Sequence, residues 1–193
     1  MTDEPAAHDP TLLRAIAHPA RTRILGELDA SGPLRAADIA RELDIPANRA
    51  SFHLRQLAKY GLIEEDPAAA RDKRDRVWRL SPQAELYVDV GAVEAAPGGL
   101  AASKVFRRSA AAWGRHVVDQ AMSDDRTPGT HRSTSEHSIK LTKEEAQELT
   151  TELTEVAERW AARTRGQDPS RRTYLLYTVL QPYPSLEQHG EEA

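Results

Sequence analysis

The sequence predicts a mainly α-helical protein with a small amount of β-structure, an α+β fold class, and three observations support this. Apolar residues recur at helical spacing through residues 10–60 and again between 142 and 165. Short strand-like runs lie between 62 and 80 and on both sides of the last helix. Hydrophobic residues make up 39% and charged residues 29% of the 193 residues, which is typical of a folded protein.

Four helices are predicted before residue 61. Residues 10–18 form a short helix, and Pro19 fits the first turn of the next one, where its missing N–H costs nothing. Ser31-Gly32-Pro33 ends this second helix. The third helix, "LRAADIARELDI", has its apolar residues at the i, i+3, i+4, i+7 spacing of one buried face: Ala36, Ile39, Ala40 and Leu43.

The fourth helix, "ANRASFHLRQLAKYG", ends at Gly61 and is followed by a predicted β-hairpin. Leu62-Ile63 begins the first strand, residues 77–80 alternate as the second, and the segment between them is too polar for a core. Trp78 is predicted to be a core residue. The residues of the fourth helix that face inward are Ala50, Leu54 and Leu57.

Three further parts are predicted after the hairpin. Residues 83–122 are expected to form a helical dimerisation region, and the polar residues 123–135 a linker. Residues 136–185 predict a β-α-β unit for dimerisation or effector binding, whose helix begins with a capping box of Thr142 and Glu145. The apolar seam of that helix has 3-4-3-4 spacing and consists of Ala146, Leu149, Leu153, Val156 and Trp160.

Residues 36–61 predict a helix-turn-helix, and the hairpin that follows would be its wing. The third helix would brace the fourth, whose N-terminal half would enter the major groove of DNA, a groove that admits one helix. Arg pairs well with guanine and Asn with adenine, whereas basic residues on a wing suit phosphates or the minor groove. The candidate DNA-binding residues are Ala47, Asn48, Arg49, Ser51, Phe52, Arg55, Lys59, Arg71, Lys73, Arg74 and Arg76.

The charge distribution agrees with this hypothesis. The net charge is −4, yet residues 46–79 hold eight basic and five acidic residues, a local excess of +3. Nucleic acid attracts such a patch, although a charged run is also typical of an ordinary solvated face. His53 lies within this region, and a packing or capping role is favoured for it over a base contact. His18, just before Pro19, is predicted to order the junction between the first two helices.

The run Ser51-x-His53-Leu54-x-x-Leu57-x-x-x-Gly61-Leu62-Ile63, with "LLRAIAHPARTRILGEL" upstream, resembles the ArsR-type winged helix-turn-helix transcriptional regulators. The resemblance covers residues 10–82 and implies a cytoplasmic homodimer that binds a palindromic operator and often represses. The usual Gln-Pro-Thr-Val-Ser opening of the fourth helix is replaced here by residues 47–51, "ANRAS". Because of this departure, the resemblance does not predict which operator sequence is bound. The way in which the helix docks on DNA is still expected to be that of the family.

Many ArsR-type regulators sense metals through Cys, or through His and Asp on a dimer helix. The chain has no Cys, which excludes thiolate sites, disulfides and a Cys nucleophile. His116 and Asp119 fall short of the four ligands that a structural metal site uses, so no metal is expected. The C-terminal extension resembles that of larger ArsR-like regulators, in which it dimerises or binds an effector.

The sequence offers no candidate catalytic set, and neither an enzyme nor a cofactor is expected. Mean hydropathy is −0.62, and no run approaches the roughly 20 apolar residues of a membrane span. The acidic N-terminus lacks the apolar region of a signal peptide, which favours the cytoplasm. Trp113 and Trp160 are interpreted as dimer or domain core, while a ligand cavity that they share with Tyr174 and Tyr177 stays open as an alternative.

The sequence therefore predicts a sequence-specific DNA-binding transcriptional regulator. It is expected to act as a homodimer on a palindromic operator in double-stranded DNA, as a repressor, under a small-molecule or protein effector. The alternative is a winged-helix protein-interaction module that recruits a partner rather than reading DNA. The basic wing favours DNA binding, whereas the negative net charge and Glu64-Glu65-Asp66 favour the interaction module.

Overall fold

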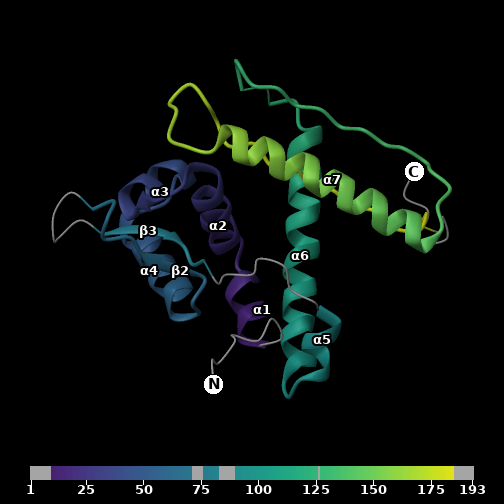
Figure 1. Ribbon diagram of the computed structural model, residues 1–193, viewed down its shortest axis with the longest axis horizontal. Helices are drawn as coiled ribbons and strands as arrows, with labels where there is room; N and C mark the ends of the chain where they lie inside the picture. The colour runs from purple at the N-terminus through teal and green to yellow at the C-terminus, as the bar shows by residue number, and fades with distance from the viewer. Residues whose placement is uncertain (1–9, 71–75, 83–89, 126, 185–193) are drawn as a thin grey trace. The chain divides into compact units, whose positions relative to one another are not determined.

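The computed structural model describes residues 10–70, 76–82, 90–125 and 127–184 (Figure 1). These residues are mostly helical with one three-stranded antiparallel sheet, as the predicted fold class requires. They form two compact units, of which the first holds residues up to 132 together with 165–173, and the second holds the remainder. The elements are α1 (Pro10–Ile16), α2 (Pro19–Ser31), β1 (Leu34–Arg35), α3 (Ala36–Leu43), α4 (Ala47–Lys59), β2 (Ile63–Glu65), β3 (Val77–Leu80), α5 (Val90–Ala95), α6 (Gly99–Met122) and α7 (Lys143–Thr164).

The junction of α1 and α2 confirms the role predicted for His18. This residue is the N-cap of α2, and its Nδ1 accepts a hydrogen bond from the Ala20 N–H at 3.2 Å. Pro19 occupies the first position of the helix, where no hydrogen bond to its nitrogen is lost. The N-cap and Pro19 therefore set where α2 begins, and α2 goes on to bury Ile24, Leu25 and Leu28.

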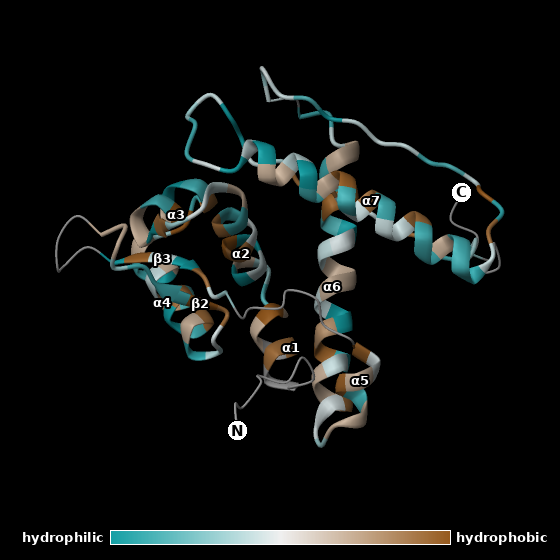
Figure 2. Cartoon of the chain, viewed as in Figure 1, coloured by the Kyte–Doolittle hydropathy of each residue, from teal (hydrophilic) through white to brown (hydrophobic). Residues whose placement is uncertain are grey.

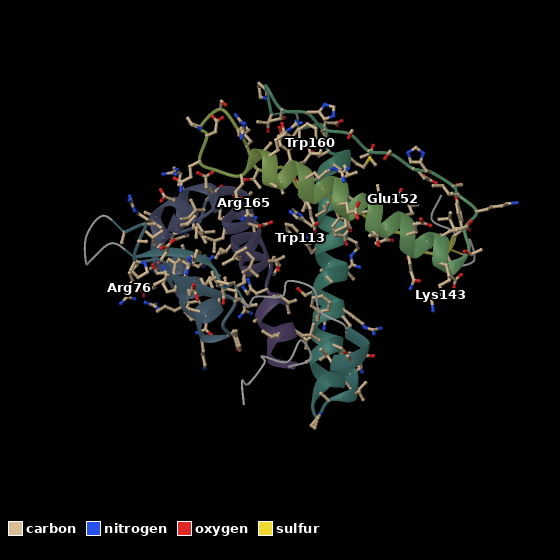
Figure 3. The ribbon with its side chains drawn as sticks, in the orientation of Figure 1. Arg76, Trp113, Lys143, Glu152, Trp160 and Arg165 are labelled. Carbon is tan, nitrogen blue, oxygen red and sulfur yellow. The ribbon has the colours of Figure 1, made fainter. Side chains whose placement is uncertain are left out.

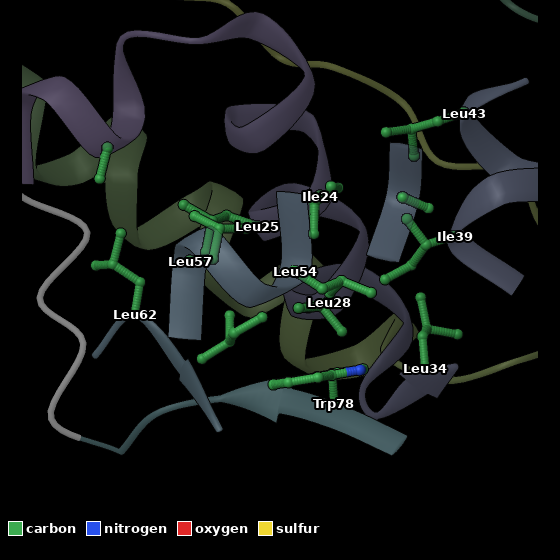
Figure 4. Close-up of a cluster of buried hydrophobic side chains, with 13 residues drawn as sticks. Ile24, Leu25, Leu28, Leu34, Ile39, Leu43, Leu54, Leu57, Leu62 and Trp78 are labelled. Atoms are coloured by element: carbon green, nitrogen blue, oxygen red, sulfur yellow. The ribbon is translucent and has the colours of Figure 1, made fainter. Parts of the chain in front are cut away.

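The core of the first unit gathers apolar side chains from α2, α3, α4 and the sheet (Figure 4). Its largest fully buried members are Ile24, Leu28, Ile39, Leu54 and Leu57. Trp78 on β3 is buried in the same cluster, which confirms the core position predicted for it. Because close-packed interiors are hard to compress, a core shared by three helices holds α4 firmly against α2 and α3.

The sheet has the strand order β1-β3-β2, so that β3 lies in the middle and pairs antiparallel with both neighbours. Leu34 faces Trp78 across one pair, and Ile63 faces Leu80 across the other. The sequence predicts β2 and β3, but its periodicity wrongly assigns residues 34–35 to the third helix. A strand of two residues has no alternation to detect, and its pairing with β3 is a tertiary interaction.

The fourth predicted helix is confirmed as α4, and its end is set by glycine. Gly61 has a φ of 69°, in the left-handed region that favours glycine over other residues. The Leu62 N–H then donates to the Leu57 carbonyl at 3.1 Å, as in a glycine-terminated helix cap. This turn directs the chain from α4 into β2.

A second apolar cluster joins α1 to α5 and α6 and consists of Leu13, Val93 and Ala102. The helical region expected from residue 83 is observed from Val90, where α5 begins, and residues 83–89 lie outside the described part. The joint between α5 and α6 is very tight. A Cβ added at Gly99 would lie 1.8 Å from the Val93 carbonyl oxygen, so only glycine fits this approach.

Residues 165–173 form a strap that packs on the C-terminal end of α2. Arg165 pairs with Asp29 at 2.5 Å, and the Gln167 side-chain amide donates to the Pro33 carbonyl at 2.8 Å. The Thr173 hydroxyl donates to the Glu27 carboxylate at 2.8 Å, and Glu27 is buried with 5% of its surface exposed. The strap therefore belongs to the first unit, whereas the sequence placed these residues in one continuous C-terminal unit.

The second unit contains α7 and confirms its predicted capping box. The Glu145 N–H donates to the Thr142 hydroxyl at 3.2 Å, and the Thr142 N–H donates to the Glu145 carboxylate at 2.7 Å. Neither segment beside α7 forms a strand in residues 133–142 or 165–184, so only the helix of the expected β-α-β unit is observed. β-prone residues need a partner strand for their backbone groups, and the apolar side chains of the second segment are exposed.

A Gly99→Ala substitution is expected to destabilise the fold. The added Cβ overlaps the Val93 carbonyl, and overpacking of this kind costs about 1–3 kcal/mol. Gly26→Ala is the matched control, because Gly26 lies inside α2 with nothing within 4 Å of an added Cβ. Alanine there should stabilise by roughly 0.5–1 kcal/mol. Urea unfolding of both variants measures the difference, and equal midpoints would contradict the tight joint.

Candidate nucleic-acid interface

The anchoring of α4 determines which of its side chains stay accessible. Ala50, Leu54 and Leu57 are fully buried, so this face of the helix is used by the core. The first turn, with Ala47, Asn48 and Arg49, is exposed. Residues that follow on the same outer side are also exposed, namely Phe52, Arg55 and Lys59. The structure therefore presents these six predicted DNA-binding residues to solvent.

A hollow of about 300 Å³ lies where α4 meets α3 and the sheet. Three arginines line it from three elements: Arg35 from β1, Arg55 from α4 and Arg76 from the residue before β3. Figure 3 labels Arg76 at this end of the first unit. The hollow's other lining residues are Ala36, Ala37, Ser51 and Trp78. Three of the predicted site residues, Ser51, Arg55 and Arg76, are thus brought together.

The chemistry of this hollow suits an oxyanion. No acidic side chain is among its lining residues, and guanidinium groups match the geometry of phosphate oxygens with paired N–H donors. Ala36 and Ala37 begin α3, and the N-terminus of a helix carries partial positive charge, which the Asp38 carboxylate of the same turn partly offsets. The Ser51 hydroxyl adds a neutral donor. A phosphate of a nucleic-acid backbone therefore matches the hollow in charge and in hydrogen-bonding chemistry.

Arg35 is a residue of this site that was not predicted from the sequence. The sequence pattern assigned it to the first turn of the third helix, where its role could not be distinguished from that of any solvated arginine. In the structure it precedes α3 as the N-cap residue, with its N–H donating to the Asp38 carboxylate at 3.3 Å. The available signal was a basic residue at the start of the first helix of the helix-turn-helix. Its place in the hollow could not be predicted, because that place depends on the pairing of β1 with β3.

Asn48 and Arg49 differ in whether their side chains are already engaged in a contact within the protein. The Asn48 side-chain oxygen accepts the Arg49 N–H at 2.9 Å, so a two-bond contact with adenine requires Asn48 to leave this bond. Arg49 is exposed at the outer edge of the first turn. Phe52 has 51% of its surface exposed and places its ring edge-on to His53 at 5.5 Å between centroids. Of these side chains, Arg49 is the least constrained.

The described part of the wing contains two ion pairs between its two sides. Arg79 pairs with Glu64 at 2.6 Å, and Arg76 pairs with Glu65 at 3.5 Å. Glu64 and Glu65, which favoured a protein-interaction module, therefore already form ion pairs with arginines of the same hairpin. The predicted contacts Arg71, Lys73 and Arg74 lie outside the described residues.

His53 is a buried residue, which confirms the packing role predicted for it. Only 5% of its surface is exposed, and its ring lies 4.7 Å from that of His18 between centroids. Its Nδ1 is buried and has no hydrogen-bond partner among the described residues. Burial lowers the pKa of both histidines, and the charges of Arg21 and Arg49 lower the pKa of each further. The pair therefore joins α4 to the start of α2 in the neutral form.

Comparison with known proteins supports the helix-turn-helix. Residues 16–66, from the end of α1 past β2, match the family described as a helix-turn-helix domain. The predicted helix-turn-helix is thereby confirmed, while the narrower resemblance to ArsR-type regulators stays a prediction. No curated protein matches the chain.

Several solved structures are similar at a low level. YusO from Bacillus subtilis is 14% identical, with 77% of this chain and 79% of that chain covered and a TM-score of 0.35. MepR of S. aureus in complex with DNA is 21% identical over 79% and 86%, with a TM-score of 0.35. A MarR mutant from E. coli is 15% identical over 78% and 88%, with a TM-score of 0.33. Similarity at this level assigns no function to the chain.

Two other kinds of site are missing from the described residues. None of the described helices has the length and apolar character needed to cross a bilayer. The described residues also contain no group of three or more His, Cys, Asp or Glu side chains placed to hold a metal ion.

Acidification below about pH 6.5, the ordinary pKa of histidine, is expected to destabilise the first unit. The pKa values of His18 and His53 are lowered in the folded state, so the unfolded chain binds more protons in this range. Stability therefore falls as pH drops. Urea unfolding between pH 7.5 and 5.5 measures it. His53→Gln should weaken this dependence, whereas His116→Gln, at an exposed position on α6, should not. Equal slopes for all three proteins would contradict the role of the pair.

Proposed function

We propose that this chain is a sequence-specific DNA-binding transcriptional regulator. The observation that carries the proposal is the arginine-lined hollow directly beside the exposed first half of α4. A phosphate bound by Arg35 and Arg55 would fix the height and tilt of α4 on the duplex, because phosphate contacts set orientation. Arg49 and its exposed neighbours would then face base edges in the major groove.

The proposal extends to a homodimer that binds a palindromic operator and represses transcription in the cytoplasm. Two copies related by a two-fold axis would place their α4 helices in half-sites about 34 Å apart, one turn of DNA. A dimer of this kind reads a palindrome because the DNA and the protein then share the same symmetry. We further propose that a small molecule or a protein acts on the regions after the wing, residues 83–122 or 136–185.

The rival function, a winged-helix module that recruits a protein partner, is less well supported by the contacts. Its main sequence argument was the acidic cluster at the start of the wing. Glu64 and Glu65 are ion-paired with Arg79 and Arg76, so a basic partner would have to displace them. Arg76 takes part in both arrangements, whereas Arg35 and Arg55 line the same concave surface, which an anion could enter.

Arg49→Ala is expected to relax sequence specificity. If Arg49 binds a guanine edge, its removal eliminates about 1–3 kcal/mol of discrimination at one base position. Binding-site selection with purified protein, followed by anisotropy titrations of single-base variants, measures this. Lys59→Ala is the control on the same helix, because a contact to the backbone should weaken all sequences equally. Unchanged discrimination in Arg49→Ala would exclude it as a base contact.

Arg35→Ala and Arg55→Ala are each expected to reduce the salt dependence of DNA binding. Removal of one phosphate-binding side chain should lower the slope of log affinity against log salt by about 1. Anisotropy titrations over a range of KCl concentrations give this slope. Arg108→Ala, at an exposed site on α6, should leave the slope as it is. Absence of any salt-sensitive binding by the unchanged protein to genomic DNA would refute the proposed function itself.

A further inference from the structure

The helix α7 of the second unit is long and yet has no buried residue. It runs for 22 residues, and all its side chains are exposed or half-buried. Helical stability in water comes mainly from packing of an apolar face, because helix nucleation is costly and propensity alone is weak. The capping box at Thr142 fixes where α7 begins but supplies only a small part of what a stable helix needs. A covering surface for α7 is therefore required.

The apolar seam of α7 has the spacing of a two-helix interface. Ala146, Leu149, Leu153, Val156 and Trp160 alternate by three and four residues, the pattern of core positions in a coiled coil. The last three members stay largely open to solvent, with exposed fractions of 43% for Leu153, 42% for Val156 and 55% for Trp160. In Figure 2 the ribbon of α7 alternates between hydrophilic and hydrophobic colours along its length. The seam therefore fits another amphipathic helix.

The charges along α7 select both the partner and its direction. Residues 143–154 contain four glutamates and one lysine, whereas residues 155–164 contain two glutamates and two arginines. A parallel pair of identical helices would place the two acidic halves together. An antiparallel pair places each acidic half against the neutral, arginine-bearing half of the other. We propose that α7 binds α7 of a second copy of this chain, antiparallel, about a two-fold axis.

The register of this pair follows from its centre. When Leu153 of one copy packs against Val156 of the other, Glu152 and Arg159 stand on the same flank of the seam. Each Glu152 then faces Arg159 of the second copy, which gives two symmetric ion pairs at the positions that set orientation in coiled coils. In a parallel pair the same positions face Ala157 and Thr164, which form no ion pair. Arg159 is available for this contact, because its ion pair with Glu155 within α7 is long, at 3.9 Å.

This inference rests on the homodimer proposed above, but on no property of the DNA site. It assigns one surface of that dimer, and it is tested without DNA. A failure of α7 pairing is therefore distinguishable from a failure of DNA binding. It is also distinguishable from dimerisation through a different surface, which sedimentation of the unchanged protein would still detect.

Cysteine cross-linking of the full chain tests the pairing, since the chain has no cysteine of its own. Thr150→Cys and Ala157→Cys lie on the other flank of the seam and face each other in the antiparallel pair. Mixing the two variants, one of them tagged, should give a mixed disulfide dimer in clear excess over either homodimer. The matched control is Thr151→Cys mixed with Glu158→Cys, which have the same spacing on the opposite face of α7. It should give no disulfide dimer.

Two other cross-linking results would overturn the proposal. A parallel pair would instead place position 152 against position 157 of the second copy, so a Glu152→Cys and Ala157→Cys mixture that gives a stronger mixed disulfide than the Thr150→Cys mixture would indicate a parallel pair. No cross-link in either mixture would assign the seam to another partner, either elsewhere in the chain or on another protein.

Charge reversal provides an independent readout of direction. Glu152→Arg alone should weaken the α7 cross-link in low salt by about tenfold, because two attractive pairs become two repulsive ones. Arg159→Glu alone should have a similar effect, and the double variant should restore the original yield. Each difference should shrink in 1 M salt, where the Debye length is only about 3 Å. A double variant no better than the single ones would exclude the Glu152–Arg159 contact and overturn the antiparallel register.

Discussion

The burial of one face of α4 is the constraint on which the rest of the first unit depends. Ala50, Leu54 and Leu57 lie in a core shared with α2, α3 and the sheet, and His53 extends the contact to the capped start of α2. A helix held along one side presents its opposite side without freedom to rotate. The exposed side of α4 is thus determined by apolar packing, and its position beside the hollow follows from the same packing.

The electrostatics of the first unit follow from this geometry more than from composition. The chain is acidic overall, yet three arginines from β1, α4 and the start of β3 line one hollow. Meanwhile Glu64 is neutralised by Arg79 across the hairpin. The fold therefore brings some of the acidic and basic side chains of this region together as ion pairs and gathers three arginines around the hollow. Local sorting of this kind is compatible with a net negative charge that would repel DNA elsewhere on the surface.

The sequence predicted the elements whose signal is local. Helices α2, α3, α4 and α7, the hairpin and the stop at Gly61 each follow from periodicity, caps or glycine within a dozen residues. The first half of α4 was likewise predicted as the exposed part of the site. Strand β1 was missed because its two residues are defined only by pairing with β3, and Arg35 was missed with it. The strands expected beside α7 did not form within one chain, because β-propensity is realised only when a partner strand is present.

The strap of residues 165–173 determines how the second unit is connected to the first. Because the chain leaves the first unit after residue 132 and returns to α2 through Arg165 and Thr173, residues 133–164 of the second unit are an insertion tethered at both ends, and the rest of that unit follows the strap. A shortened chain that stops at residue 132 would lose more than the second unit. It would also remove the Thr173 hydroxyl that donates to the carboxylate of Glu27 on α2, together with the strap that packs there. The helix-turn-helix unit therefore consists of two separate stretches of the sequence, and no single cut after residue 132 isolates it.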